Sequence, residues 1–385
     1  MGKEIKTAID HLNFYKENDI SPVNQDITNL KIHFERRNSL YRLLGIPPIL
    51  IKNKNILEVG PGSGHNSIVV ASHKPRKYTL LEPNKTGVAN INKLFQNLDF
   101  EHTPPHININ KLEDYVPKEL FDIVITEGWL GISDHERSMM KKVFNFIKPG
   151  GIFLITLASP TGSISNSLRR LLANLITMEV RSFKEKSRLL CDVFQSHLET
   201  LGDMSRISED WVQDTLLNPG FMTISVTPEM FLRDLGDQLE IYNTYPSFHS
   251  EWRWYKSLHS ENSNINNNIL NSYFNNSHNF FDYNEVFLPR ERDKNIELDN
   301  LALDLLRYLI DLEEHNKNLN RTKIIEIVTK IQRNLNDTSQ KWCDGIEEVI
   351  TLLTDEKISG QKISSMKSFN KIFGRELIYC SSIKK

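Results

Sequence analysis

Short apolar runs alternate with amphipathic stretches between residues 51 and 159, a pattern that predicts strands separated by helices. A capping box, Ser133–Glu136, marks the start of one of these helices. Because strand and helix alternate, we expect an α/β fold built on a mainly parallel sheet. The strand-like runs are Ile56–Val59, Tyr78–Glu82, Phe121–Thr126 and Lys148–Ile155, and the helical stretches are Asn84–Leu98 and the segment with Met140, Val143, Phe144 and Ile147.

The rest of the chain divides around this core. Residues 1–50 form an N-terminal helical segment with Leu30, Phe34, Tyr41 and Leu44 on one face. A helical insertion is expected at 160–226, a return to the core at 227–245, a mainly helical insertion at 246–370 and a closing strand at 371–385. Insertions that leave the carboxyl ends of parallel strands lie at the ligand edge, so we expect both to form a lid.

Within these segments, Gln238–Tyr242 is the expected sixth strand and Phe373–Cys380 the expected seventh. The asparagine-rich stretch Glu261–Asn279 is expected to be a loop. Three helical seams predict a small bundle, and a homodimer contact through them stays an open alternative. The seams are Leu298, Leu301, Leu305, Tyr308 and Leu312; Ile324, Val328, Ile331 and Leu335; and Trp342, Ile346, Val349 and Leu353.

Composition limits the function. Forty-seven basic and forty-nine acidic side chains leave a net charge of −2 over 385 residues, which argues against a nucleic-acid substrate. Cys191, Cys343 and Cys380 are too scattered for a metal cluster, and neither CxxC nor HExxH occurs, so no metal site is predicted. No apolar run reaches the length of a membrane span and the start is no signal peptide, so we expect no integral membrane segment and a cytoplasmic location.

A glycine turn follows the first apolar strand and opens a helix. Gly60, Gly62 and Gly64 let the backbone approach a ligand closely, and the first N–H groups of the helix point towards it. The spacing G-x-G-x-G differs from the G-x-G-x-x-G of dinucleotide-binding proteins, whose last glycine would fall on His65. This difference favours S-adenosylmethionine over NAD, although an NAD-dependent oxidoreductase stays the runner-up.

Glu82 ends the next strand, about 20 residues on, where an acid can accept hydrogen bonds from both ribose hydroxyls of a nucleotide-like cofactor. With this acid, the chain resembles the class I S-adenosylmethionine-dependent methyltransferases. The resemblance rests on E-V-G-P-G-S-G, Glu82, the strand Phe121–Thr126 and the turn and strand Lys148–Ile155. It implies a Rossmann-like, seven-stranded sheet with an antiparallel last strand, and S-adenosylmethionine as cofactor. An aminopropyl transferase would share this fold. The implied cofactor-binding positions are Glu58, Gly60, Pro61, Gly62, Gly64, His65, Asn66, Glu82, Pro83, Asn84, Asn110, Leu112, Glu127 and Gly128.

The catalytic candidates follow the fourth strand, where the family places the methyl group. Glu127 is a candidate base, a candidate contact for the cofactor's methionine amino group, or a candidate acceptor contact, and the alternative is that it only caps a turn. His135 is of a residue type suited to proton transfer, but its position in the capping box also fits a solvated helix start. His65 and Asn66 open a helix and either touch the cofactor's carboxylate or satisfy free N–H groups.

The acceptor is the least constrained part. Glu251–Lys256 and two neighbouring phrases, Glu209–Val212 and Leu217–Phe221, combine tryptophan and phenylalanine with polar residues, which suits a sugar ring; Trp252 and Trp254 fit a buried core equally well. These phrases resemble bacterial methyltransferases associated with surface-polysaccharide biosynthesis. We therefore expect O-methylation of a sugar, a glycan-related molecule or another small polar acceptor. N-methylation of a small metabolite and a non-catalytic cofactor-binding subunit stay as alternatives.

Overall fold

A computed structural model describes residues 11–131, 133–202, 204–219, 226–249, 252, 254–257, 264–314 and 319–385. The chain divides into two compact units. The sheet unit comprises Asp19–Ala158, Ser225–Tyr273 and Leu377–Lys385. The helical unit comprises Met1–Asn18, Ser159–Ile224 and Phe274–Glu376.

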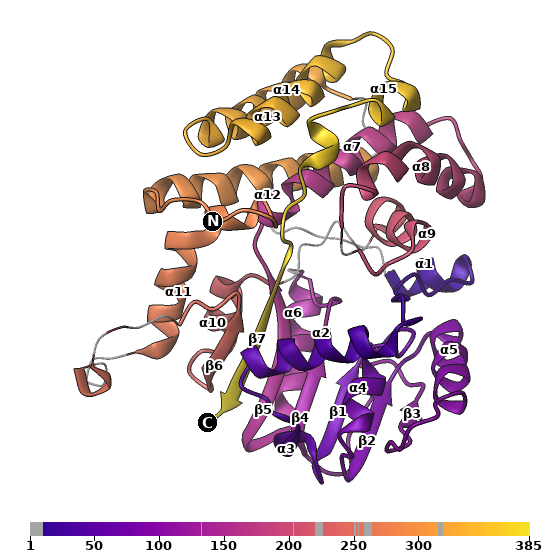
Figure 1. The fold of residues 1–385 in the computed structure, drawn as a ribbon, viewed down its shortest axis with the longest axis vertical. Coiled ribbons are helices and arrows are strands. Elements are labelled where there is room, and N and C mark those ends of the chain that lie inside the picture. Colours follow the sequence, from indigo (N-terminus) through magenta and orange to yellow (C-terminus); the bar gives the residue numbers. More distant parts are fainter. Residues whose placement is uncertain are drawn as a thin grey trace. The chain divides into compact units, whose positions relative to one another are not determined.

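The sheet unit contains seven strands in the order β3-β2-β1-β4-β5-β7-β6 (Figure 1). The strands are β1 (Asn55–Val59), β2 (Lys77–Leu81), β3 (His106–Asn108), β4 (Phe121–Thr126), β5 (Ile147–Ala158), β6 (Leu239–Tyr245) and β7 (Leu377–Lys384). All neighbours from β3 to β5 are parallel, whereas β7 runs antiparallel to both β5 and β6. The predicted Rossmann-like methyltransferase sheet is thereby confirmed.

The last strand comes from the C-terminus, as the sequence predicts, but begins at Leu377, later than the expected Phe373. Leu377 pairs with Ala158 at the carboxyl end of β5, and Ile383 pairs with Ile152. Because β6 is antiparallel to β7 in turn, β6 is parallel to β5 and ends at the same edge of the sheet. The loops that follow β1, β4, β5 and β6 therefore all leave one edge.

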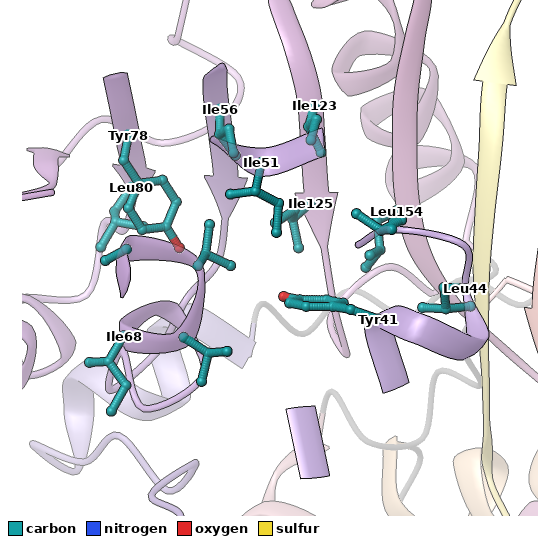
Figure 2. Packing of buried hydrophobic residues seen from close by; sticks show 14 of the residues in the cluster. Tyr41, Leu44, Ile51, Ile56, Ile68, Tyr78, Leu80, Ile123, Ile125 and Leu154 are labelled. Atoms are coloured by element: carbon teal, nitrogen blue, oxygen red, sulfur yellow. The ribbon is translucent and has the colours of Figure 1, made fainter. Parts of the chain in front are cut away.

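Helices cover both faces of this sheet. On one face, α2 (Leu30–Leu43), α3 (Pro48–Ile51) and α4 (Ser67–Ser72) pack against alternate residues of the strands, and α5 (Lys85–Gln96) adds Ile91 to the same cluster. Figure 2 shows Tyr41 and Leu44 beside Ile125 and Leu154 in this core. On the other face, α6 (Asp134–Asn145) and α10 (Pro228–Leu235) contact β5 through Phe144 and Phe231, whose rings both approach Phe153.

The helical unit contains eight α-helices among its described residues. They are α1 (His11–Glu17), α7 (Ile164–Thr177), α8 (Phe183–Leu198), α9 (Ser208–Trp211), α12 (Arg292–Glu314), α13 (Arg321–Leu335), α14 (Gln340–Thr354) and α15 (Gly360–Ser364). Shorter turns are η1 (Thr161–Ser163), the π-helical η2 (Val212–Leu217), η5 (Ser277–Phe280) and η6 (Phe369–Lys371). The predicted seams of α13 and α14 are buried throughout, and in α12 Leu298, Leu301, Leu305 and Tyr308 are buried as well.

The asparagine-rich stretch corrects the sequence prediction. Instead of a loop, most of its described part is a helix, α11 (Ile265–Asn276), which begins in the sheet unit. Asn266, Ile269 and Tyr273 are buried at helical spacing. The amide of Asn266 accepts from the Ile241 N–H at 2.9 Å and donates to the Leu239 carbonyl at 3.0 Å. The buried Asn266 side chain thus satisfies the hydrogen-bonding backbone groups of two β6 residues, which the composition of the stretch did not reveal.

Within the described residues, no helix combines the length and the apolar character that a membrane span requires.

Candidate functional site

The glycine turn follows β1 directly and has an unusual backbone. Gly60, Gly62 and Gly64 have φ angles of +71°, +60° and +79°, a backbone region that residues other than glycine rarely adopt. A Cβ atom on Gly62 would lie 2.3 Å from Cγ2 of Val23. The turn lies beside the point where β1 pairs with both β2 and β4, which is where open α/β sheets bind their ligands.

Glu82 follows β2 and turns its carboxylate towards the glycine turn. Its Oε2 accepts the Gly62 N–H and its Oε1 accepts the Asn84 N–H, each at 2.9 Å. A carboxylate offers about four lone-pair positions, so each oxygen retains one acceptor position. Burial raises the pKa of Glu82 to about 7, partly offset by these two backbone hydrogen bonds. The sequence-predicted pairing of glycine turn and acid is therefore present, with Asn84 capping α5 beside it.

Residues 20–25, the strap, pass over the glycine turn. Asn84 Nδ2 donates to the Ile20 carbonyl at 3.0 Å, and Ser63 Oγ donates to the Val23 carbonyl at 3.3 Å. The Gln25 N–H donates to Nδ1 of His65 at 2.7 Å. Burial, with His33 nearby, lowers the pKa of His65 to about 4, so this ring is neutral and can accept that hydrogen bond. His65 thus holds the strap in this structure.

Glu58 lies on the sheet face covered by α2 and α4. It is 6% exposed, and its carboxylate accepts a short hydrogen bond from the Tyr78 hydroxyl. Burial raises the pKa of Glu58 to about 7, and the nearby Glu127 raises it further, while Tyr78 and Arg37 lower it. The side chain therefore belongs to a buried polar network behind the glycine turn.

Glu127 follows β4 and forms a salt bridge with Arg37 of α2. Arg37 donates from Nη2 to Oε1 at 2.7 Å and from Nη1 to Oε2 at 3.1 Å, so the pair is bidentate. The two side chains are only 9% and 15% exposed. Nη2 of Arg37 also donates to the Tyr41 hydroxyl at 3.0 Å. Both oxygens of Glu127 are thus already engaged by one guanidinium.

The turn after Glu127 is tied to both neighbouring strands. The Gly128 N–H donates to Thr156 Oγ1 at 2.7 Å, and the indole N–H of Trp129 donates to the Val59 carbonyl at 3.0 Å. The Trp129 ring also lies against Gly60, where a Cβ atom would come within 2.9 Å of Cδ1. The Trp129 side chain therefore packs against the glycine turn.

The remaining predicted positions differ in exposure. His135 stands at the start of α6, largely exposed, and its Nε2 lies 3.2 Å from Oε1 of Glu113. Asn110 is exposed and donates its N–H to Asn108 Oδ1, whereas Leu112 is buried. Asn66 precedes α4 without a side-chain capping bond, and Pro61 and Pro83 are half-buried. In the described part of the chain, the hydrogen bonds to the carboxylate of Glu82 come instead from Gly62 and Asn84.

Arg37 and the strap are the parts of the site that the sequence analysis missed. Arg37 had a signal, because it occupies the same helical stripe as Phe34, Tyr41 and Leu44. A charged residue inside an apolar stripe needs a buried partner, and Glu127 is that partner. The strap had no such signal, since residues 20–25 show no periodic pattern.

The sequence matches a protein-family model, and the structure is similar to several solved structures. A family model described as a methyltransferase domain matches residues 33–197, just under half of the 385 residues. No curated protein matches the sequence. The chain is similar to the solved structure of the N-methyltransferase NodS from Bradyrhizobium japonicum WM9 in complex with S-adenosyl-L-homocysteine, with 20% sequence identity, a TM-score of 0.30, and coverage of 39% of this chain and 74% of that chain. It is also similar to the structure of PKMT2 from Rickettsia typhi in complex with AdoHcy, with 14% sequence identity, a TM-score of 0.40, and coverage of 63% of this chain and 50% of that chain.

The matched region contains the glycine turn, Glu82 and the strand that precedes Glu127. The predicted enzyme class agrees with this match, since residues 33–197 match a methyltransferase domain.

Proposed function

We propose that this protein transfers the methyl group of S-adenosylmethionine to a hydroxyl oxygen of a sugar or a glycan-related small molecule. The observation that carries the acceptor class is the exposure of an aromatic cluster after β6. Trp252 is 96% exposed, Trp254 63% and Tyr255 59%. The two tryptophans fit either a core or an acceptor contact by sequence, and their exposure supports the acceptor contact.

The aromatic cluster suits a sugar. The Trp254 and Tyr255 rings lie 4.9 Å apart, and Lys256 Nζ lies 5.8 Å from the Trp254 ring and 5.9 Å from the Tyr255 ring. Flat rings beside a hydrogen-bond donor can stack on the apolar face of a sugar while the donor binds a hydroxyl. The cluster follows β6 along the chain, and β6 ends at the sheet edge that carries the glycine turn.

We propose that Glu82 binds both ribose hydroxyls of the cofactor, because each of its oxygens retains one acceptor position. Methyl transfer from a sulfonium is an in-line displacement, in which the protein aligns the acceptor and takes up its proton. We propose that His135 takes up the proton of the acceptor hydroxyl and that Glu127 helps to position the acceptor. If Nε2 of His135 donates to the Glu113 carboxylate, Nδ1 is left to accept a proton.

The acceptor assignment is tested with S-adenosylmethionine that carries a ¹³C-methyl group and a panel of monosaccharides and glycosides. We expect an O-methyl product. In Trp252→Ala/Trp254→Ala we expect the KM for the sugar to rise roughly 5- to 150-fold, from about 0.5–1.5 kcal/mol for each ring contact. Ile49→Ala, on the exposed surface of α3, is the control. An N-methyl product, or an unchanged KM, would contradict the proposal.

A further inference from the structure

The Trp129 side chain is held in place beside the first glycine of the glycine turn. Its indole N–H donates to the Val59 carbonyl at the end of β1, at 3.0 Å. A Cβ atom on Gly60 would lie 2.9 Å from Cδ1 and 3.1 Å from Nε1 of this ring, so only glycine leaves room for it. The Gly128 N–H, just before the ring, donates to Thr156 Oγ1 at 2.7 Å. A ring held in this way loses little conformational freedom when a ligand arrives.

The surroundings of the ring leave part of it open to solvent. Gly60, against which the ring lies, and Gly128, which precedes it, are both exposed, and Trp129 itself is half-buried. A Cβ atom on Gly128 would meet nothing within 4 Å among the described residues beyond its chain neighbours. Part of the aromatic surface is therefore accessible to a ligand at the carboxyl ends of β1 and β4, as a ring buried in the core would not be.

The covalent structure of S-adenosylmethionine directs its charged centre towards this ring. The sulfur is bonded to C5′, the carbon attached to the ribose ring, so it stays close to a ribose bound at Glu82. Glu82 follows β2, and the neighbouring strand β1 is about 4.8 Å away. The Gly60 N–H donates to the Leu81 carbonyl at 3.0 Å, which joins the two strand ends. A ribose at Glu82, with the rest of the cofactor along the glycine turn, therefore brings the sulfur to the end of β1, where Trp129 lies.

A sulfonium ion restricts how a protein can recognise it. It carries a permanent positive charge but has no N–H or O–H group, so it cannot donate an ordinary hydrogen bond. The carboxylate that follows β4, Glu127, is already in a bidentate salt bridge with Arg37, so this pair offers no net charge. The face of an aromatic ring attracts such a cation, and tryptophan does so more strongly than tyrosine or phenylalanine.

We propose that the face of Trp129 binds the sulfonium of S-adenosylmethionine through a cation–π contact, an inference that rests on the proposed function. S-adenosylhomocysteine, the product form, is neutral because its sulfur has lost the methyl group and the charge. Trp129 therefore favours the substrate form of the cofactor over the product form, and so helps the spent cofactor to leave.

The test is calorimetric titration of the full chain, without an acceptor, with S-adenosylmethionine and with S-adenosylhomocysteine. In Trp129→Leu, which keeps an apolar side chain but has no aromatic face, we expect the Kd for S-adenosylmethionine to rise about 2- to 30-fold more than the Kd for S-adenosylhomocysteine. Trp129→Phe loses the hydrogen bond to Val59 but keeps an aromatic face, so it should retain more of the preference than Trp129→Leu. Tyr242→Leu, which removes an exposed ring of β6, is the matched control and should leave the ratio of the two Kd values unchanged.

A second measurement needs no substitution. Wild-type protein produced with 5-fluorotryptophan keeps the shape of the Trp129 ring, while fluorine draws electron density from its face. The preference for S-adenosylmethionine over S-adenosylhomocysteine should therefore weaken in this protein as well. Thermal melting confirms that each protein is folded.

The cofactor assignment and the cation–π contact fail differently. If neither ligand binds the wild type, the proposed function is refuted and the contact with it. If both ligands bind, and a folded Trp129→Leu weakens both to the same degree or 5-fluorotryptophan leaves their ratio unchanged, the contact is refuted and the cofactor assignment stands. A loss of preference as large in Trp129→Phe as in Trp129→Leu would assign the effect to the hydrogen bond with Val59, and would also refute the contact.

Discussion

The salt bridge between Arg37 and Glu127 gives a quantitative prediction for the sheet unit. Both side chains are at least 85% removed from solvent, and three hydrogen bonds end on the Arg37 guanidinium. Burial lowers the pKa of Arg37, but Glu127 and Tyr41 raise it well above its usual value, so the guanidinium stays charged. Arg37→Met would leave Glu127 unpaired near Glu58 and cost about 3–5 kcal/mol.

Hydrogen exchange measured by mass spectrometry on peptides from α2 and β1 reports the opening free energy of this unit separately. We expect Arg37→Met to lower it by that amount, and Arg42→Met, an exposed position on the same helix, to leave it within about 0.5 kcal/mol. Adding Glu127→Gln to Arg37→Met removes the unpaired charge and should recover about 2 kcal/mol. A loss below about 1 kcal/mol in Arg37→Met would refute the buried-pair reasoning.

Three further predictions concern the strap, the cofactor and the last strand. Gly62→Ala and Gly150→Ala each place an alanine in a left-handed backbone conformation, which lowers stability by about 1–2 kcal/mol. Only the new Cβ atom at position 62 meets a neighbour, Val23, so only Gly62→Ala should speed amide exchange in residues 20–25. Burial raises the pKa of Glu82 to about 7, and ribose hydroxyls donate hydrogen bonds to its ionised form. Titrations with S-adenosylhomocysteine should therefore show an affinity that falls as the pH drops below about 7, and Glu82→Gln should lack this pH dependence. Deleting Leu377–Lys385 removes the strand between β5 and β6, so circular dichroism should show a cooperative loss of structure; a truncated chain that still binds S-adenosylhomocysteine would contradict this.

The sheet could be predicted from the sequence because its signals are local. Buried parallel strands form continuous apolar runs, and Ser133 reveals its helix through a capping box whose hydroxyl accepts the Glu136 N–H at 3.2 Å. The strand β3 escaped prediction because it has only three residues and carries no apolar run. The closing strand was recognised by composition, but composition did not fix its first residue.

The site was only partly predictable. The glycine turn and Glu82 are close in sequence and follow successive strands, so their spacing reveals them. Arg37 and Glu127 are 90 residues apart, and only the packing of α2 on the sheet brings them together.

Calorimetric titration of the full chain with S-adenosylhomocysteine and with NAD tests the central claim, that the glycine turn and Glu82 hold the cofactor. We expect S-adenosylhomocysteine to bind and NAD to give no heat. In Glu82→Ala we expect affinity to fall about a hundredfold or more, since each hydrogen bond to a charged carboxylate contributes about 1.5–3 kcal/mol. Binding of NAD, or an unchanged affinity for S-adenosylhomocysteine in a folded Glu82→Ala variant, would contradict the account.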